Sequence, residues 1–232
     1  MFDGKYKALT FSYDDGVTQD MRLIELFDRY GMKATFNLNS GLLGQKRELI
    51  RNHVPVRHDK VDPAQVRALY RGHEVAVHTL THPNLTQVDD AEIIRQCAQD
   101  QKTLSDLCGY EVVGMAYPGG GINYSAHAAE VIRSNTSLAY CRTTVCTGDF
   151  APQDNLHEFK PSVYHLDFDE MFALGEKFLA LEAETEQIFY IWGHSYEFDA
   201  WNFWDQFEDF LRMMAGRPDI FYGTNRQVLL GV

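Results

Sequence analysis

Short apolar segments alternate with amphipathic helical patterns along almost the whole chain, and this alternation limits the possible folds more than any other feature. Each strand candidate is β-branched or aromatic and ends in turn residues, as residues 8–13 do before the sequence DDG. Each helical pattern spaces its apolar residues three or four apart, as residues 90–108 do before Gly109. About seven such repeats, with no linker between them, predict one α/β domain over residues 1–232 with a mainly parallel sheet.

The strand and helix candidates can be placed along the chain. No G-x-G-x-x-G sequence follows a strand, so a closed or partly open barrel is favoured over a doubly wound sheet. In either architecture the chemistry is expected at the carboxyl ends of the strands. Strands are expected at residues 8–13, 34–38, 73–78, 112–117, 138–145, 188–192 and 220–222, and helices near 18–30, 63–72, 90–108, 125–134, 168–181 and 202–214.

The charge balance limits the possible partners. The chain has 33 acidic residues against 21 lysines and arginines, a formal net charge of −12. Binding to nucleic acid or to an anionic membrane begins with a basic face, so neither is expected as a partner. No targeting segment and no run of eighteen apolar residues is present, which predicts a cytoplasmic protein. The four cysteines form no C-x-x-C pair, and we expect buried free thiols.

Three polar clusters fall where predicted strands end. Asp14 and Asp15 are adjacent, His78 and His82 are four residues apart, and His194 follows a strongly apolar strand. Taken singly, each has an ordinary explanation, such as a solvated turn or a hydrogen-bonded histidine at a strand end. Together, one carboxylate and two histidines provide a three-ligand metal site with open positions. A second carboxylate and a further histidine can then act as base and acid.

These clusters resemble the motifs of a known family. Residues 12–16 (SYDDG) are similar to the T-F-D-D-G motif of polysaccharide deacetylases, which contain NodB-like domains and form carbohydrate esterase family 4. Residues 78–83 (HTLTHP) match the family's H-[ST]-x-x-H-P motif, and His194 is similar to its late histidine. The resemblance spans nearly the whole chain. It implies the family's fold, a deformed (β/α) barrel of about seven parallel strands.

The resemblance also implies an activity and roles for residues. Asp15, His78 and His82 would bind a divalent metal, most often zinc, although other transition metals also occur. Asp14 would be the general base and His194 the general acid. The implied reaction is hydrolysis of an N-acetyl or O-acetyl group on a sugar or short glycan by metal-activated water. The substrate would therefore be an N-acetylated sugar or oligosaccharide.

The third motif of the family differs in this chain. Residues 116–120 (AYPGG) stand where the family has R-x-P-[FY]-G, so the arginine that pairs with the base is missing. The alignment makes the backbone N–H of Gly119 the oxyanion donor and places Tyr117 among the candidate substrate-site residues. Arg142, on the next predicted strand, is our hypothesis for the missing guanidinium. The alternative is that Arg142 is an ordinary arginine on the surface of the strand.

The fourth motif, of the type Asp-x-x-Asp-Trp, cannot be placed. Asp149 and Asp154 are candidates, but no tryptophan follows either of them. The group that tunes His194 is therefore unassigned from sequence. Trp192 and Tyr196, the aromatic residues nearest His194, are expected to line the site.

Two other functions remain open at the level of sequence. Relatives of the family open cyclic amides such as allantoin, or imides, and the missing arginine favours this alternative. A carbohydrate-binding relative without activity is the second, although base, acid and three ligands are all present. The remaining histidines belong to no motif and are expected to be structural or exposed: His53, His58, His73, His127, His157 and His165.

Overall fold

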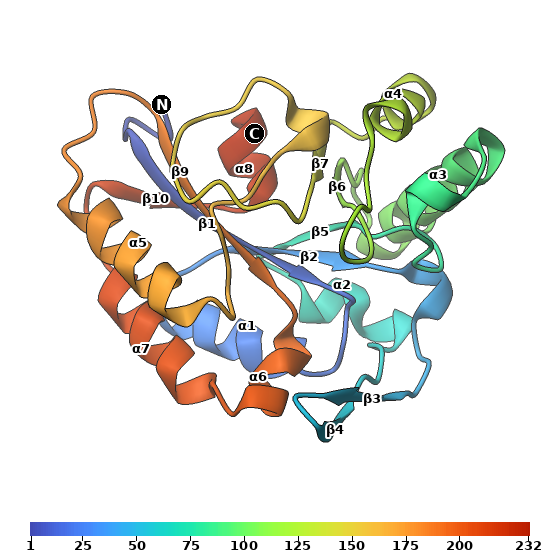
Figure 1. Cartoon of the computed structure of the whole chain (residues 1–232), viewed down its shortest axis with the longest axis horizontal. Helices are drawn as coiled ribbons and strands as arrows, with labels where there is room; N and C mark the ends of the chain where they lie inside the picture. The colour runs from blue at the N-terminus through green and yellow to red at the C-terminus, as the bar shows by residue number, and fades with distance from the viewer.

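The computed structural model describes all 232 residues and contains one eight-stranded sheet (Figure 1). The strand order is β7-β6-β5-β2-β1-β9-β8, and every neighbouring pair is parallel. The last strand, β10, pairs with the first half of β1, on the edge that β2 occupies further along. The strands are β1 (Lys7–Asp14), β2 (Ala34–Leu38), β5 (Glu74–Val77), β6 (Gly114–Ala116), β7 (Tyr140–Arg142), β8 (Val163–Tyr164), β9 (Gln187–Gly193) and β10 (Ile220–Tyr222).

The sheet curls, and one segment links its two sides. Phe159 forms a parallel bridge with Arg142 of β7, and a few residues later the Ser162 N–H donates to the Tyr190 carbonyl of β9 at 2.8 Å. The prediction of a deformed barrel of parallel strands is thereby confirmed. The prediction of seven strands omitted β8, which is only two residues long.

Helices surround the sheet in the order that the repeats predicted. The long helix α3 begins where the Asp89 side chain accepts a hydrogen bond from the Glu92 N–H, and ends at Gly109, whose φ of 77° is left-handed. None of the helices is long and apolar enough to span a membrane. A cytoplasmic location stays a prediction. The helices are α1 (Asp20–Arg29), α2 (Val66–Leu69), α3 (Asp90–Cys108), α4 (Ala126–Asn135), α5 (Phe168–Ala180), α6 (Ser195–Trp201), α7 (Trp204–Met214) and α8 (Asn225–Leu230).

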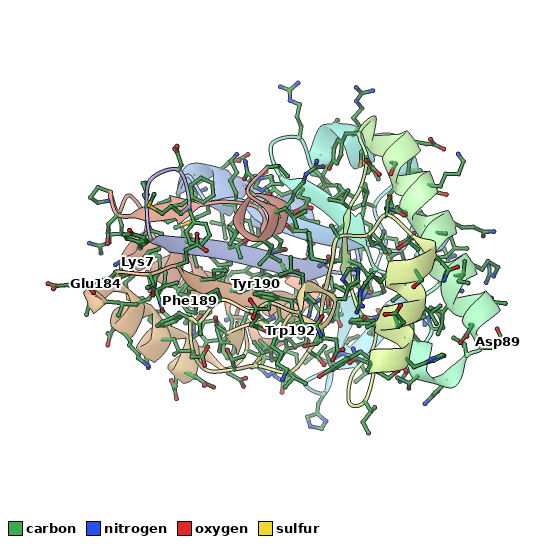
Figure 2. All side chains as sticks on the ribbon, turned by 90° about the horizontal axis from the view of Figure 1, so that it is seen from above. Lys7, Asp89, Glu184, Phe189, Tyr190 and Trp192 are labelled. Carbon is green, nitrogen blue, oxygen red and sulfur yellow. The ribbon has the colours of Figure 1, made fainter.

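Alternation along β1 separates an apolar face from a polar one. Leu9, Phe11 and Tyr13 join a core cluster of 43 buried residues that packs the helices against the sheet. Burying each such side chain stabilises the fold by about 1.5–3 kcal/mol. The intervening residues face the other side, so the alternation that buries Tyr13 in the core places Asp14 on the opposite face, where the strand ends. Phe189, Tyr190 and Trp192 follow one another along β9 from the Lys7 end of the molecule (Figure 2).

Several elements were not predicted from the sequence. The strands β3 (Glu48–Arg51) and β4 (Val54–Arg57) form an antiparallel hairpin separate from the main sheet. Figure 1 shows this hairpin beside α6, and the Asn52 side chain donates to the Ala200 carbonyl there at 3.2 Å. The short helices α6 and α8 were also missed. All four cysteines are free, but Cys146 is exposed, contrary to expectation, because it lies in the loop after β7.

Candidate metal and catalytic site

The predicted site residues converge because the strands that precede them are parallel. Asp14 ends β1, His78 follows β5 and His194 follows β9, so their side chains meet at the carboxyl edge of the sheet. They line one cavity of about 540 Å³, together with Gly119 and the two predicted aromatic residues. The lining residues are Asp14, Asp15, Leu42, Arg47, Leu49, Arg51, His58, Lys60, His78, Thr81, His82, Gly119, Gly120, Tyr164, Trp192, His194, Tyr196 and Glu197.

Asp15, His78 and His82 are arranged as a metal-binding set. One ligand atom from each lies within 4.8 Å of the others. His78 Nδ1 lies 2.9 Å from the Ala116 carbonyl and donates to it, while His78 Nε2 is buried without any partner. An unpartnered buried nitrogen facing a carboxylate is what a metal ligand requires, so these residues fit a divalent transition ion.

The ionisation states of the two histidines also suit metal binding. Burial lowers the pKa of His78 to about 4 and outweighs the attraction of Asp14. Burial likewise lowers the pKa of His82. Both imidazoles are therefore neutral at pH 7, which is the form that binds a metal.

The loops that carry these ligands have unusual backbone conformations. Asp15, Thr79 and His82 have φ values of 85°, 65° and 63°, in the left-handed region that residues other than glycine rarely adopt. Such conformations cost about 1–3 kcal/mol each and persist where surrounding contacts impose them. The Asn39 side chain provides two of those contacts, donating to the His78 and Thr79 carbonyls at 2.5 and 3.0 Å.

Two residues that carry no sequence motif hold the carboxylate of Asp15. Lys60 Nζ lies 3.1 Å from Asp15 Oδ1 and 2.6 Å from its carbonyl, and His58 Nε2 lies 3.1 Å from Oδ2. Burial alone would raise the pKa of Asp15, but Lys60 and His58 outweigh it and hold the pKa well below its usual value. His58 therefore belongs to the site. Its lack of a motif led to the prediction that it is outside the site, and that prediction is wrong.

Arg142 contacts Asp14 directly. Its Nη2 lies 2.5 Å from both carboxylate oxygens, and the side chain is fully buried rather than exposed on the strand. The Asn37 amide donates to Asp14 Oδ1 at 2.8 Å. Burial would raise the pKa of Asp14, but Arg142 and two nearby histidines lower it below the usual value. Asp14 is thus held as a carboxylate beside the metal-binding set.

His194 is linked to Glu197, three residues later at the start of α6. The Glu197 carboxylate lies 3.0 Å from His194 Nδ1 and 2.8 Å from His165 Nε2, and it accepts a hydrogen bond from Tyr164 at 2.5 Å. Burial alone would lower the pKa of His194, but the charges of Glu197 and, to a smaller extent, Asp14 outweigh burial and raise the pKa to about 9. At pH 7 His194 is therefore protonated, with Nε2 facing the cavity 4.0 Å from Asp14 Oδ2.

The comparison with protein families assigns the chain to a family. A family model described as polysaccharide deacetylase matches residues 3–135, more than half of the chain. The chain belongs to the polysaccharide deacetylase family. The match includes Asp14, Asp15, His78, His82 and Gly119, and it ends before Arg142, His194 and Glu197.

Individual relatives agree with this assignment. A peptidoglycan-N-acetylglucosamine deacetylase, PgdA, from Listeria monocytogenes is 27% identical over 119 residues, covering 50% of this chain and 22% of that protein. A peptidoglycan-N-acetylglucosamine deacetylase from Bacillus cereus is 31% identical over 127 residues, covering 52% of this chain and 40% of that protein. The matched part of the chain thus spans less than half the length of these relatives.

A solved structure confirms the fold over nearly the full length. A family 4 carbohydrate esterase from Streptomyces lividans, in complex with acetate, has a TM-score of 0.58 to this structure. The similarity covers 95% of this chain and 92% of the other, at 18% sequence identity. The shared fold therefore includes the part of the chain beyond residue 135.

Three residues that the motifs of this family suggested do not lie in the cavity. Tyr117 is buried in the core, and its hydroxyl donates to the His157 carbonyl at 2.9 Å. Side chains alternate between the two faces at the end of β6, and the Tyr117 side chain lies on the face away from the cavity. Asp149 and Asp154 are in the loop after β7 and line no part of the cavity. Glu197 contacts His194 in their place, and its spacing of three residues at a helix start was the signal available in the sequence.

Arg142 provides a direct test of how Asp14 is kept ionised. We expect Arg142→Ala to lower kcat/KM about 10–100-fold, since burial then raises the pKa of Asp14 against the nearby histidines alone. The loss should be larger at pH 6 than at pH 8, because the carboxylate form predominates above its pKa. Arg142→Lys should recover only part of the rate, since the lysine side chain ends one bond short of the position of Nη2 and its ammonium cannot approach Asp14 as closely. Unchanged kcat/KM in the alanine variant would remove the role from Arg142.

Proposed function

We propose that this protein is a metal-dependent hydrolase that removes the acetyl group from an N-acetylated sugar or short glycan. The observation that supports this most strongly is the position of Asp14 between two histidines of different kinds. His78 Nε2, which is neutral and unpartnered, lies 4.0 Å from Asp14 Oδ2, and so does Nε2 of the protonated His194. A base, an acid and a metal ligand thus face the same space.

The side chains of this protein divide the proton transfers between them. Asp14 is ionised and accepts a proton from the attacking water, and Arg142 stabilises its charge beforehand. His194 is protonated and donates from Nε2 to the nitrogen that leaves as the amine. The Gly119 N–H makes no hydrogen bond within the chain and lines the cavity, so it is free to donate to the developing oxyanion.

The metal-binding set suits zinc or a similar ion. Asp15, His78 and His82 would hold it, and a bound ion would supply Lewis acidity, lowering the pKa of water and polarising the acetyl carbonyl. The cavity of about 540 Å³ is large enough for a sugar residue and part of a neighbour. Trp192, Tyr164 and Tyr196 give it aromatic walls that suit the apolar faces of a sugar ring.

Removal of the metal is expected to abolish the reaction. Protein dialysed against a chelator should release no acetate from N-acetylglucosamine oligosaccharides, and one equivalent of Zn²⁺ should restore the release. Because a ligand that binds only the folded state stabilises it, the melting temperature should rise when Zn²⁺ is added. His78→Ala should show neither response. Full acetate release by protein that contains no stoichiometric divalent ion would contradict the proposal.

The two alternative functions predict different products. The cyclic-amide alternative depended on the missing arginine, but Arg142 supplies a guanidinium to Asp14, so that reason no longer favours it. The non-catalytic alternative predicts sugar binding without acetate. A panel of N-acetylated sugars tested for acetate release, together with cyclic amides tested for ring opening, separates all three.

A further inference from the structure

The β3–β4 hairpin brings positive charge to one wall of the cavity. Arg47, Leu49 and Arg51 line the cavity, whereas the residues between them, Glu48 and Ile50, do not. Side chains alternate between the two faces of a strand, so this segment presents one basic face to the cavity and the other to solvent. The hairpin lies apart from the main sheet, beside α6 (Figure 1).

Neither guanidinium on this wall has a carboxylate partner. Arg51 Nη1 donates to the Ile50 carbonyl, at 3.1 Å, and Arg47 contacts a carboxylate only through its backbone N–H, which donates to Asp59 Oδ1 at 3.1 Å. Exposed arginines elsewhere in the chain are of both kinds: Arg29, Arg95, Arg133 and Arg212 form ion pairs, whereas Arg57, Arg67 and Arg71 form none but do not line the cavity. The two unpaired guanidinium groups are therefore available to a ligand in the cavity.

The distance from the catalytic groups is suitable for a substituent of the substrate. The Arg51 guanidinium lies 5.9 Å from the centre of the Tyr196 ring, and that ring lies 5.2 Å from the ring of His194. A single aromatic ring thus separates Arg51 from the proposed acid. A group on the reacting sugar or on its neighbour can reach Arg51 while the acetyl group stays beside Asp14, and Arg47 lines the same cavity.

We propose that Arg47 and Arg51 select an N-acetylated glycan that carries a carboxylate, close to the sugar that is deacetylated. The planar guanidinium matches a carboxylate in a two-bond geometry, and such charge-assisted bonds are stronger than neutral ones. This proposal rests on the deacetylase function above. It also differs from what the net charge of −12 suggests, because the cavity wall that the hairpin forms carries two arginines, although Asp14, Asp15 and Glu197 line the same cavity.

The test compares an acidic and a neutral substrate of equal length. The acidic one is a tetrasaccharide of alternating glucuronic acid and N-acetylglucosamine, and the neutral one is the N-acetylglucosamine tetramer. Arg47→Gln/Arg51→Gln is expected to lower kcat/KM for the acidic substrate at least about tenfold, mainly through KM, and to lower that for the neutral one by a much smaller factor. KM for the acidic substrate should also rise with ionic strength in the wild type alone.

One control variant and one binding measurement keep the outcome clear. Arg57→Gln removes an exposed arginine from the same hairpin that does not line the cavity, and it should change neither rate. Equal losses on both substrates, or no loss on either, would overturn the carboxylate proposal while acetate release from the neutral tetramer keeps the deacetylase function. If the wild type cleaves neither substrate, calorimetric binding of the acidic tetrasaccharide decides: binding lost in the double variant supports the proposal, and no binding to the wild type refutes it.

Discussion

Asp14→Asn is expected to lower kcat about 10³-fold, with little change in KM. Asparagine has the shape of aspartate, but its amide cannot accept a proton at neutral pH, so the attacking water loses its base. The proposed metal ligands are Asp15, His78 and His82, and the metal content of the variant should therefore equal that of the wild type. Acetate release under saturating substrate, measured together with metal analysis, checks both expectations.

Asp14→Asn also lowers the free energy of unfolding, and the experiment must separate this effect from the effect on catalysis. Arg142 is fully buried against Asp14, and removing one partner of a buried ion pair costs about 3–5 kcal/mol. Asp14→Asn should therefore melt at a lower temperature than the wild type. The double variant Asp14→Asn/Arg142→Met removes the unpaired charge and should recover part of that stability but none of the activity. A single variant that keeps wild-type kcat would show that Asp14 is not the base.

The residues that the sequence located share one property. Asp14, Asp15, His78 and His194 lie at or just beyond the ends of strands, and the carboxyl ends of parallel strands meet wherever such a sheet forms. Their convergence therefore follows from the β-α alternation alone. The α/β fold could be predicted for the same reason, whereas the choice of Asp15, His78 and His82 as metal ligands came from the resemblance to the deacetylase motifs.

The residues that support them could not be located in this way. Arg142 is 128 residues from Asp14, and Lys60 is 45 residues from Asp15, so no local pattern relates the partners. For Arg142 the sequence left two interpretations open, a partner of Asp14 and a surface arginine, since a buried and an exposed arginine on a strand look alike in sequence. Such contacts depend on how far each side chain reaches across the curled sheet.

The hairpin was missed because its turn lacks the usual residues. Asn52 and His53 both have positive φ, 47° and 62°, as a two-residue turn requires. Glycine normally occupies the second position, and histidine there gives no turn signal. The segment from residue 47 to residue 51 places two arginines and a leucine at alternate positions, which in retrospect indicates a strand with one face toward a ligand.

The second large effect concerns Glu197, the unpredicted partner of His194. We expect Glu197→Gln to move the alkaline limb of the kcat profile to lower pH by about one unit or more. The direction follows from the charges: burial lowers the pKa of His194, and Glu197 is the strongest of the groups that raise it to about 9. A general acid must be protonated, so activity falls as the pH rises through that pKa. Without the Glu197 carboxylate, kcat begins to fall at a lower pH.

The pH profile distinguishes this positioning role from a purely structural one. Glutamine retains the shape of glutamate and can still bond to Tyr164 and His165, so the fold should be preserved. A structural defect would lower the rate equally at every pH, whereas loss of the charge lowers it most on the alkaline side. Glu130→Gln, an exposed substitution on α4 remote from the cavity, should leave the profile unchanged. An unshifted alkaline limb in Glu197→Gln would mean that Asp14 and Asp15 suffice to keep His194 protonated, and the proton donated to the leaving amine would then not depend on Glu197.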